Sequence, residues 1–430
     1  MSEIFFCQEK LISLCTRLTD GSHFSPKPQR IGRSIVNVKD FRNGYVDLYS
    51  CTKIKPNEFQ ILEASGCTCS PGDILFSKDG TVGKVIVYLQ QEKIAVLSSI
   101  CIIHPKHFLD QKFLGHVLLS PALSQQIANL MSGSAIRRLV LRDISELKIP
   151  LPQRNEQLAI AAILDSVDEA IRQTEAVIAK LRQVKAGMLH DLLTCGLDEN
   201  GELRDPSRHP EQFKDSPLGR IPKEWEVISL SSITDFMTSG SRGWAQFYAS
   251  DGPLFLRIGN LTREHINLRL DDIVHVQPPQ GTEGARTKVT TGDLLISITA
   301  DLGIIGCVSE KIGVAFVNQH IALVRLNKEV NPRWVAYYLA SPSYQHRFGL
   351  LNDAGAKAGM NLTSVGNLQL SIPAHVPEQV RIVQCLDEVD GQVETEKRNL
   401  GKLILLKHGL MHDLLTGTVR VPANLLEATP

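Results

Sequence analysis

Two long stretches of this chain have apolar residues spaced in alternating steps of four and three. The first runs from Arg154 to Thr194, contains no proline and has a single glycine, Gly187. Its apolar positions are Ile160, Leu164, Val167, Ile171, Ile178, Leu181 and Met188. This heptad spacing predicts one helix of about 41 residues, roughly 60 Å long.

The second stretch repeats the first, with apolar positions at Ile382, Leu386, Val389, Val393, Leu400, Leu403 and Leu410. Polar residues interrupt both stretches at matched positions, namely Thr174 and Lys185 in the first and Glu396 and Lys407 in the second. Polar residues in a helix seam tend to set its register. The matched breaks therefore favour an antiparallel coiled coil between the two helices over two unrelated amphipathic helices that each pack on their own domain.

The repeat extends beyond the seam. GMLHDLLT at 187–194 returns as GLMHDLLTG at 409–417, and Glu156-Gln157 returns as Glu378-Gln379, both at an offset of 222 residues. Pro71-Gly72-Asp73 corresponds to Thr291-Gly292-Asp293, while most of the intervening sequence diverges. The order is therefore divergent domain, repeated helix, divergent domain, repeated helix, with an internal pseudo-two-fold relation.

The divergent parts have short apolar runs separated by Gly and Pro, which indicate strands. These runs are Lys84–Leu89, Ala95–Ile103, Leu294–Ile298 and Val314–Arg325, and helices are expected at Leu114–Leu130 and Pro332–Phe348. The fold class is therefore α+β (mixed α/β). Residues 195–224 are rich in Asp, Glu, Pro and Gly and are expected to be an extended linker.

Charge and composition narrow the possible classes of protein. The net charge is zero, which argues against a free-standing nucleic-acid binder, although residues 1–150 have 18 Lys and Arg against 13 Asp and Glu, a local charge of +5. No apolar run is long enough to span a membrane, and the first ten residues lack the basic start of a signal peptide. The nine cysteines have no paired metal-ligand spacing. We expect a cytoplasmic protein with reduced thiols.

Motifs for catalysis are missing. Gly80 to Lys84 lacks the spacing of a phosphate loop, and there is no H-E-x-x-H, no G-x-S-x-G and no dinucleotide fingerprint. His190 and His412 each precede an aspartate, but adjacent helical residues point about 100° apart and do not share a metal easily. We expect no catalytic residue, cofactor or metal in this chain.

Five motifs, in this order, resemble type I restriction-modification specificity subunits. They are TDGSHFSP at 19–26, PGDILFSKDGTVGK at 71–84, the IPLP entry at 149–152, GRIPKEW at 219–225 and HDLLT closing both helices. The resemblance implies target-recognition domains at 1–152 and 225–373, repeated helices at 153–194 and 374–417, a linker at 195–224 and a tail at 418–430.

The resemblance also implies a function. Each divergent domain would read one half of a bipartite, asymmetric site in double-stranded DNA, and the coiled coil would set the gap. Two modification subunits would methylate adenine with S-adenosylmethionine, and two restriction subunits would translocate and cleave DNA with ATP and Mg²⁺. This chain itself would be non-catalytic.

The candidate DNA-contacting residues lie in loops. In the first domain they are His23, Lys78, Thr81, Lys84, Ser134, Arg137 and Arg138, and in the second Arg242, Trp244, Lys357 and Asn361. Adjacent arginines suit guanine edges or phosphates, and asparagine suits adenine. A solvated basic loop at Arg137-Arg138 and a core role for Trp244 remain open. Ser239 and Ser241 are weaker candidates. The second domain has SITADLG at 297–303 where the first has the version with Lys78 and Lys84, so it lacks both lysines.

Three alternatives remain at this point. A self-contained methyltransferase or nuclease would need cofactor motifs that the sequence lacks. A coiled-coil scaffold would not need large divergent domains. A specificity subunit whose partner fuses methyltransferase and nuclease would have the same sequence features.

Overall fold

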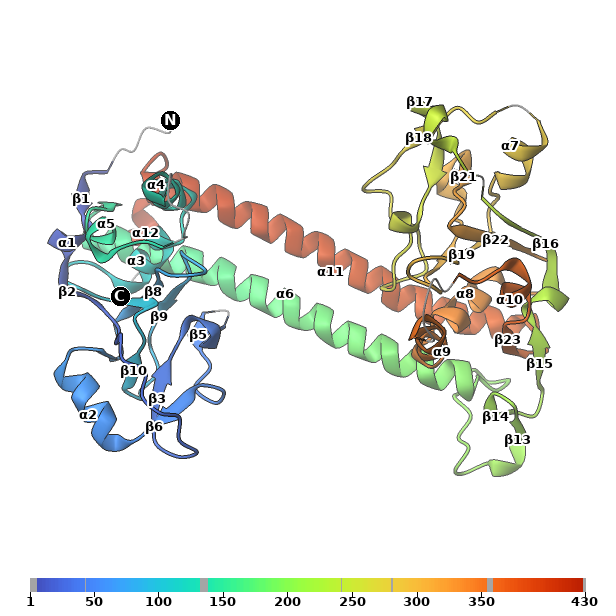
Figure 1. The fold of residues 1–430 in the computed structure, drawn as a ribbon, viewed down its shortest axis with the longest axis horizontal. Coiled ribbons are helices and arrows are strands. Elements are labelled where there is room, and N and C mark those ends of the chain that lie inside the picture. The colour runs from blue at the N-terminus through green and yellow to red at the C-terminus, as the bar shows by residue number, and fades with distance from the viewer. Residues whose placement is uncertain are drawn as a thin grey trace. The chain divides into compact units, whose positions relative to one another are not determined.

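The computed structural model describes residues 6–42, 44–131, 138–240, 242–279, 281–353 and 359–427. The chain folds as two compact units. Unit 1 comprises residues 1–175 and 399–430, and unit 2 comprises residues 176–398. Each unit is a mixed arrangement of helices and strands (Figure 1), so the predicted fold class is confirmed.

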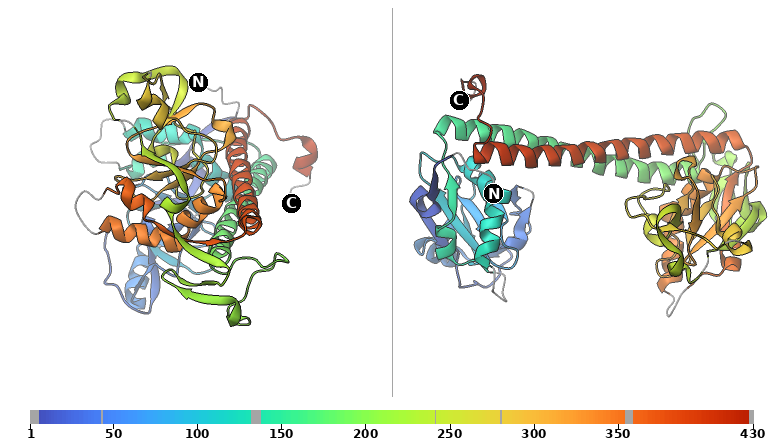
Figure 2. Two further views of the ribbon diagram at one scale, coloured as in Figure 1. Left: turned by 90° about the vertical axis from the view of Figure 1, so that its right-hand side faces the viewer. Right: turned by 90° about the horizontal axis from the view of Figure 1, so that it is seen from above.

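The two predicted long helices are confirmed. Helix α6 spans Arg154–Thr194 and helix α11 spans Val376–Thr416, 41 residues each. Unit 1 contains the start of α6 and the end of α11, and unit 2 contains the remainder of both. In each unit, the strands lie to one side of its two helix segments (Figure 2). Apolar side chains of both helices, such as Leu164 and Leu415 in unit 1, belong to the hydrophobic core of the unit.

Unit 1 is built on two four-stranded sheets. The first has the order β2-β11-β8-β9, with β2 at Cys15–Asp20, β11 at Ile100–Pro105, β8 at Ile74–Ser77 and β9 at Val85–Val87. The second has the order β6-β3-β10-β7, with β6 at Thr52–Ile54, β3 at Arg33–Val36, β10 at Ile94–Val96 and β7 at Thr68–Cys69. Strands β3 and β10 are parallel. Two further antiparallel pairs join β1 (Gln8–Lys10) to β12 (Lys148–Pro150) and β4 (Phe41–Arg42) to β5 (Tyr45–Val46).

Unit 2 repeats the strand order of the first sheet, but its second sheet has three strands where that of unit 1 has four. Its first sheet is β16-β22-β19-β20, with β16 at Thr234–Ser239, β22 at Ile321–Leu326, β19 at Leu294–Ser297 and β20 at Ile305–Cys307. Its second sheet is β18-β17-β21, with β18 at His275–Val276, β17 at Tyr248–Leu256 and β21 at Ala315–Val317, and β17 is parallel to β21. Strand β15 (Trp225–Ser229) pairs with β23 (Gln369–Pro373), as β1 pairs with β12.

The shorter helices differ from the prediction in one respect. Each helix expected as a single element is two, because Pro121 and Pro342 have no amide hydrogen and begin a second helix. Unit 1 has α1 at Leu11–Leu14, α2 at Pro56–Ala64, α3 at Gln111–Leu118, α4 at Pro121–Met131, α5 at Leu141–Ser145 and α12 at Ala423–Glu427. Unit 2 has α7 at Thr282–Thr287, α8 at Pro332–Ala340, α9 at Pro342–Asp353 and α10 at Leu362–Gly366.

The segment at 195–224, expected to be an extended linker, contains an antiparallel hairpin. Strand β13 (Phe213–Ser216) pairs with β14 (Gly219–Pro222). Among the described residues, no helix is long and apolar enough to cross a bilayer.

Candidate nucleic-acid interface

A buried aspartate fixes the turn before the central strand of each unit. Asp73 precedes β8, and its carboxylate accepts a hydrogen bond from Arg17 at 2.6 Å and lies 2.7 Å from Nδ1 of His104. Asp293 precedes β19 and accepts two hydrogen bonds from Arg325 at 2.8 and 2.7 Å. Both carboxylates are fully enclosed, with side-chain exposures of 1 %. The repeated Gly-Asp motif therefore anchors the strand rather than contacting a ligand.

A buried serine organises the loop after that strand in both units. The Ser77 hydroxyl donates to the carbonyl of Thr81 at 2.6 Å and accepts from the amide of Lys84 at 2.7 Å. The Ser297 hydroxyl donates to the carbonyl of Asp301 at 2.5 Å and accepts from the amide of Ile304 at 2.8 Å. The two loops therefore have the same backbone frame.

The side chains on this shared frame differ. Gly80 has a φ of +70°, and Ala300 takes the corresponding position with a φ of +60°. Thr81 and Lys84 are exposed, so they stay available for phosphate contacts. Ile304, which replaces Lys84 in unit 2, is buried.

Lys78 does not fit its predicted role as a phosphate contact. Its side chain is 1 % exposed, and its ammonium lies 3.3 Å from Oδ2 of Asp20. The charge is thus neutralised and enclosed, and Lys78 ties the end of β2 to the loop. His23 is exposed, and its Nε2 lies 4.0 Å from Oδ2 of the same Asp20 carboxylate. Ile298, the counterpart in unit 2, is also buried.

Three predicted residues, Ser134, Arg137 and Lys357, lie outside the described residues. Arg138 is described, and it forms an antiparallel bridge with Asp79 in the serine-organised loop. Its Nε lies 4.0 Å from the Asp79 carboxylate, and its side chain is 47 % exposed. The structure thus brings Arg138 beside the loop that presents Thr81 and Lys84.

The same backbone contact occurs in both units. The amide of Leu139 donates to the carbonyl of Lys78 at 2.8 Å, and the amide of Met360 donates to the carbonyl of Ile298 at 2.9 Å. In unit 2 this contact brings Asn361 close to the serine-organised loop.

The remaining unit 2 candidates have different surroundings. Asn361 is exposed and caps α10, accepting a hydrogen bond from the amide of Ser364 at 2.8 Å. Trp244 is 2 % exposed and stacks on Phe255, with ring centroids 5.6 Å apart. The prediction of a DNA contact by Trp244 is therefore wrong, and its core role holds. Arg242 is exposed.

Sequence reasoning missed two exposed cations, Lys27 and Arg30, in the loop between β2 and β3. One signal for them was available, because no acidic residue occurs between Asp20 and Asp40.

The repeated Glu-Gln pair explains how each domain is attached to its helix. Gln157 Oε1 accepts from the amide of Asp110 at 2.8 Å, and Gln379 Oε1 accepts from the amide of Asn331 at 2.9 Å. Asp110 and Asn331 are the N-caps of α3 and α8. Both glutamines are buried, so each holds the first helix of its domain against a long helix.

The adjoining glutamates bind the segment that follows the end of the other long helix. In unit 1, Glu156 accepts two hydrogen bonds from Arg420 at 2.7 and 2.6 Å. In unit 2, Glu378 accepts from Arg204 at 2.6 Å and from the indole of Trp225 at 3.2 Å. Each carboxylate is buried and paired, which makes these contacts strongly dependent on geometry.

The lysines that interrupt the predicted seam form ion pairs between the helices. In unit 2, Lys185 of α6 lies 2.5 Å from Asp390 of α11, and both side chains are nearly enclosed, with exposures of 11 % and 8 %. In unit 1, Lys407 of α11 lies 2.5 Å from Asp168 of α6, with exposures of 23 % and 22 %. The four residues follow the 222-residue repeat, so the two pairs are related by it.

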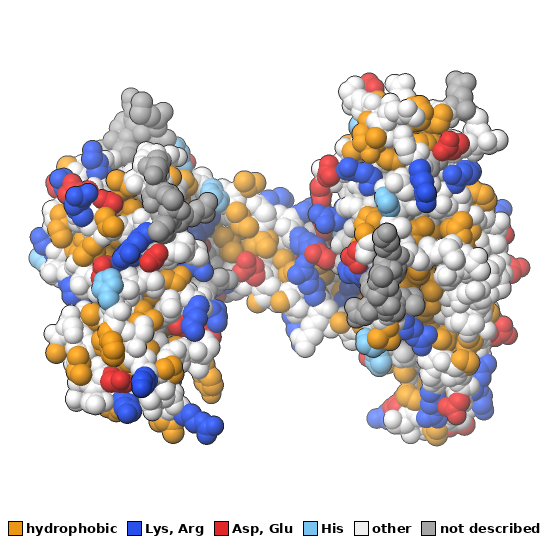
Figure 3. All heavy atoms as spheres, in the orientation of Figure 1, with side chains coloured by type: hydrophobic (Ala, Val, Ile, Leu, Met, Phe, Trp, Pro, Cys, Tyr) orange, Lys and Arg blue, Asp and Glu red, His pale blue; other side chains and the backbone are white. Residues whose placement is uncertain are grey.

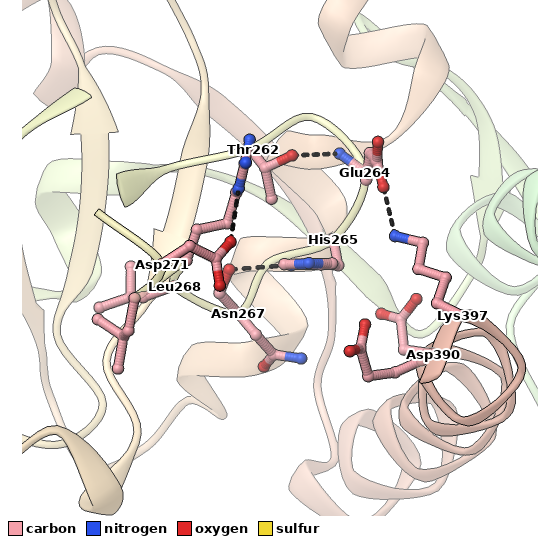
Figure 4. A pocket seen from close by; sticks show the side chains of 11 residues that line it. Thr262, Glu264, His265, Asn267, Leu268, Asp271, Asp390 and Lys397 are labelled. Carbon is pink, nitrogen blue, oxygen red and sulfur yellow. Dashed lines mark hydrogen bonds and ion pairs between the residues drawn. The ribbon is translucent and has the colours of Figure 1, made fainter. Parts of the chain in front are cut away.

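In unit 2, a further acidic residue contacts both long helices beside this ion pair. Glu264, in the loop after β17, lies 2.5 Å from Lys397 of α11 and 3.3 Å from Arg182 of α6. Its backbone carbonyl accepts a hydrogen bond from Lys185 at 3.0 Å. Figure 4 shows Glu264 facing Lys397 at the edge of a hollow of about 500 Å³. The hydrogen bond from Lys397 lowers the pKa of Glu264.

Comparison with known proteins identifies matching sequences. A family model described as the type I restriction modification DNA specificity domain matches residues 32–183 and 222–404. The MjaVIII specificity subunit of Methanocaldococcus jannaschii is 22% identical over 356 residues, which cover 81% of this chain and 77% of that protein. The EcoBI specificity subunit of Escherichia coli is 20% identical over 396 residues, which cover 90% of this chain and 80% of that protein.

A solved structure shares the fold. The crystal structure of a type I restriction-modification S subunit from M. genitalium superimposes with a TM-score of 0.60 at 17% identity, covering 96% of both chains.

Proposed function

Because this chain belongs to the type I restriction-modification DNA specificity family, we propose that it reads a bipartite, asymmetric DNA site, one half with each divergent domain. Its curated relatives are named specificity subunits, the non-catalytic components that give such systems their DNA sequence specificity. In this proposal, residues 1–152 and 225–373 are the two target-recognition domains.

One observation supports the asymmetric site above all others. The first sheets of the two domains have the same strand order and are followed by the same serine-organised loop, but the loops present different side chains. Unit 1 presents Thr81, Lys84 and Arg138, whereas unit 2 has Asp301 and a buried Ile304 on the same frame. Matching first sheets with different loop side chains suit two half-sites of different sequence, because base readout depends on the side chains that reach the base edges.

The long helices are proposed to pair as an antiparallel coiled coil that sets the gap between the half-sites. The repeat-related ion pairs, Lys185 with Asp390 and Lys407 with Asp168, support this pairing, because each fixes one register of α6 against α11. The hydrogen bonds from Arg420 to Glu156 also support the pairing, because Arg420 follows the end of α11 and Glu156 lies near the start of α6. Repeated helices at 153–194 and 374–417, the segment 195–224 and the tail 418–430 complete the proposed organisation.

Two modification subunits are proposed to dock on the helices and methylate adenine with S-adenosylmethionine. Two restriction subunits that use ATP and Mg²⁺ would complete the endonuclease. The cytoplasmic location stays a prediction.

Sequencing of methylated adenines tests this proposal in a host that expresses this chain with its neighbouring methyltransferase. The expected result is a gapped, asymmetric motif that disappears when this chain is deleted. Unchanged methylation after deletion would contradict the proposed function and favour a scaffold without DNA specificity.

A pair of variants tests which domain reads which half of the DNA motif. Lys84→Ala, in the serine-organised loop of unit 1, combined with Arg138→Ala beside it should relax or weaken one half of the motif and leave the other intact. Arg242→Ala in unit 2 is the matched variant for the second half. Equal loss of both halves in the first variant would argue against one domain per half-site.

A further inference from the structure

The loop between β2 and β3 is held rigidly at its base. The amide of Gly21 donates to the carbonyl of Ile100 at 3.0 Å, and a Cβ at Gly21 would lie 2.4 Å from the carbonyl oxygens of Val96 and Leu97. Only glycine allows this close approach. The amide of Ser22 donates to the carbonyl of Val96 at 2.7 Å.

The far side of the loop is also fixed. The amide of Gln29 donates to the carbonyl of Lys53, in β6, at 2.8 Å. Pro26 is buried, and a second proline, Pro28, follows within the loop, so the backbone between the two anchor points has restricted φ angles. The segment at 23–31 is therefore a preorganised projection from unit 1.

The charge of this region has one sign. From Gly21 to Lys39 the chain has four lysines and arginines and no acidic residue. Arg33 is used within the fold, because it donates to the carbonyl of Lys93 at 3.0 Å and covers the ring of Phe59. Lys27 and Arg30 are exposed, and no ion pair to either occurs within the described part of the chain. Two exposed cations on a loop that is anchored at both ends and contains no acidic residue suit a polyanion.

Two large apolar side chains project beside these cations. Phe24 is 63% exposed and Ile31 is 90% exposed. Figure 3 shows basic and hydrophobic side chains together at the end of unit 1 where β3 and β6 lie. Apolar side chains next to phosphate-binding cations suit the sugar edges and base steps of a DNA groove.

We infer that residues 23–31 form a DNA-contacting finger specific to the first domain, in which Lys27 and Arg30 bind backbone phosphates and Phe24 and Ile31 pack into the groove. This inference rests on the proposed function and extends it to Phe24, Lys27, Arg30 and Ile31, which are not among the contacts predicted from the sequence. The finger positions the domain on the duplex, and the Phe24 and Ile31 contacts add dependence on the bases at the first half-site.

The corresponding region of unit 2 differs in its described residues. The amide of Gly240 donates to the carbonyl of Ile321, as Gly21 does to Ile100, but Trp244, four residues later, is buried. Residues 225–373 also have twelve basic and twelve acidic residues, so the second domain has no net charge. The two half-sites are therefore bound with unequal electrostatic contributions.

The test is a titration of the full chain, co-expressed with its methyltransferase subunits, against a fluorescent duplex with the motif found by methylation sequencing. Affinity is measured as a function of salt concentration for the wild type and for Lys27→Ala with Arg30→Ala. Loss of two phosphate contacts should reduce the slope of log K against log salt by about 2. The matched control is Lys10→Ala with Lys148→Ala, which removes two charges from the paired strands β1 and β12 and should leave the slope unchanged.

A second variant pair tests the apolar contacts. Phe24→Ala with Ile31→Ala should lower affinity for the motif by about tenfold and leave the salt slope unchanged, because no charge is lost. Ile12→Ala in α1, also an exposed apolar side chain, is its control. Methylation sequencing with this variant should show relaxed sequence at the first half-site alone.

Failure of the inference is distinct from failure of the proposed function. If the wild-type complex does not prefer its motif over a shuffled duplex, the proposed function is wrong. If it does, and Lys27→Ala with Arg30→Ala keeps the wild-type salt slope, the assignment of DNA contacts to residues 23–31 is wrong. Loss of methyltransferase assembly in this variant, seen by size exclusion, would also overturn the inference and assign the loop to a protein partner.

Discussion

The ion pair between Lys185 and Asp390 allows a quantitative prediction. Both side chains are nearly enclosed, and their charged atoms are 2.5 Å apart. Lys185→Met keeps most of the stem volume but leaves the Asp390 carboxylate buried, with the hydroxyl of Tyr337 at 2.8 Å as its remaining partner. A stranded buried charge costs about 3–5 kcal/mol. Adding Asp390→Asn removes that charge, so the double variant should recover about 2–3 kcal/mol of the loss.

The related pair in unit 1 is the matched control. Lys407 and Asp168 are separated by the same 2.5 Å but are about twice as exposed, at 23 % and 22 %. Water therefore solvates the remaining carboxylate, and Lys407→Met should cost only about 1 kcal/mol. The same chemical change at two repeat positions thus isolates the effect of burial.

Amide hydrogen exchange is the appropriate assay, because two units need not unfold as one transition. Opening free energies are compared for peptides covering 180–190 and 385–395 in unit 2, and 163–173 and 402–412 in unit 1. Equal losses for Lys185→Met and Lys407→Met would refute the argument from burial. A double variant no more stable than Lys185→Met would refute the argument from the stranded charge.

Three further outcomes are expected. Ala300→Gly should raise the thermal unfolding midpoint, stabilising unit 2 by about 0.5–1 kcal/mol, since Ala300 has a φ of +60°; an unchanged or lower midpoint would contradict this. Burial raises the pKa of Asp165, but hydrogen bonds from His116 and Lys112 outweigh this effect and bring the pKa to about 2. Its stabilising effect is present above about pH 4 and lost as pH falls through about 2, so Asp165→Asn should reduce the acid-induced loss of stability; equal loss in acid titrations would refute this. Cys7 is the exposed thiol, whereas burial raises the pKa of Cys307 to about 11; a thiol-reactive dye should label Cys7 first, and a fast phase that survives Cys7→Ser would contradict this.

Local pattern was enough to predict the two long helices and the repeat. Heptad spacing is a property of neighbouring residues, and it located α6 and α11 to within a few residues. It also marked Lys185 and Lys407 as polar seam positions. Pro121 and Pro342 are also local signals, because a proline tends to begin or end a helix. The predicted helices nevertheless ran through both prolines, so the two helix breaks were missed.

The candidate interface depended on contacts between distant residues. Lys78 and Lys84 are six positions apart in one motif, yet one is enclosed by Asp20 from β2 and the other is exposed. Trp244 lies in a glycine-rich turn that suggested a surface loop, but it packs on Phe255 from β17. Burial of a side chain depends on which strands become neighbours, and that information is absent from the residues around it.

Sequence by itself therefore determined the periodic helices, the repeated order and the family to which the chain belongs. The tertiary structure alone decided which lysines pair with Asp168 and Asp390, and which cations of unit 1 face the solvent. The physical reason is that helix formation follows from spacing along the chain, whereas the exposure and pairing of a charge follow from residues that are distant in sequence and close in space.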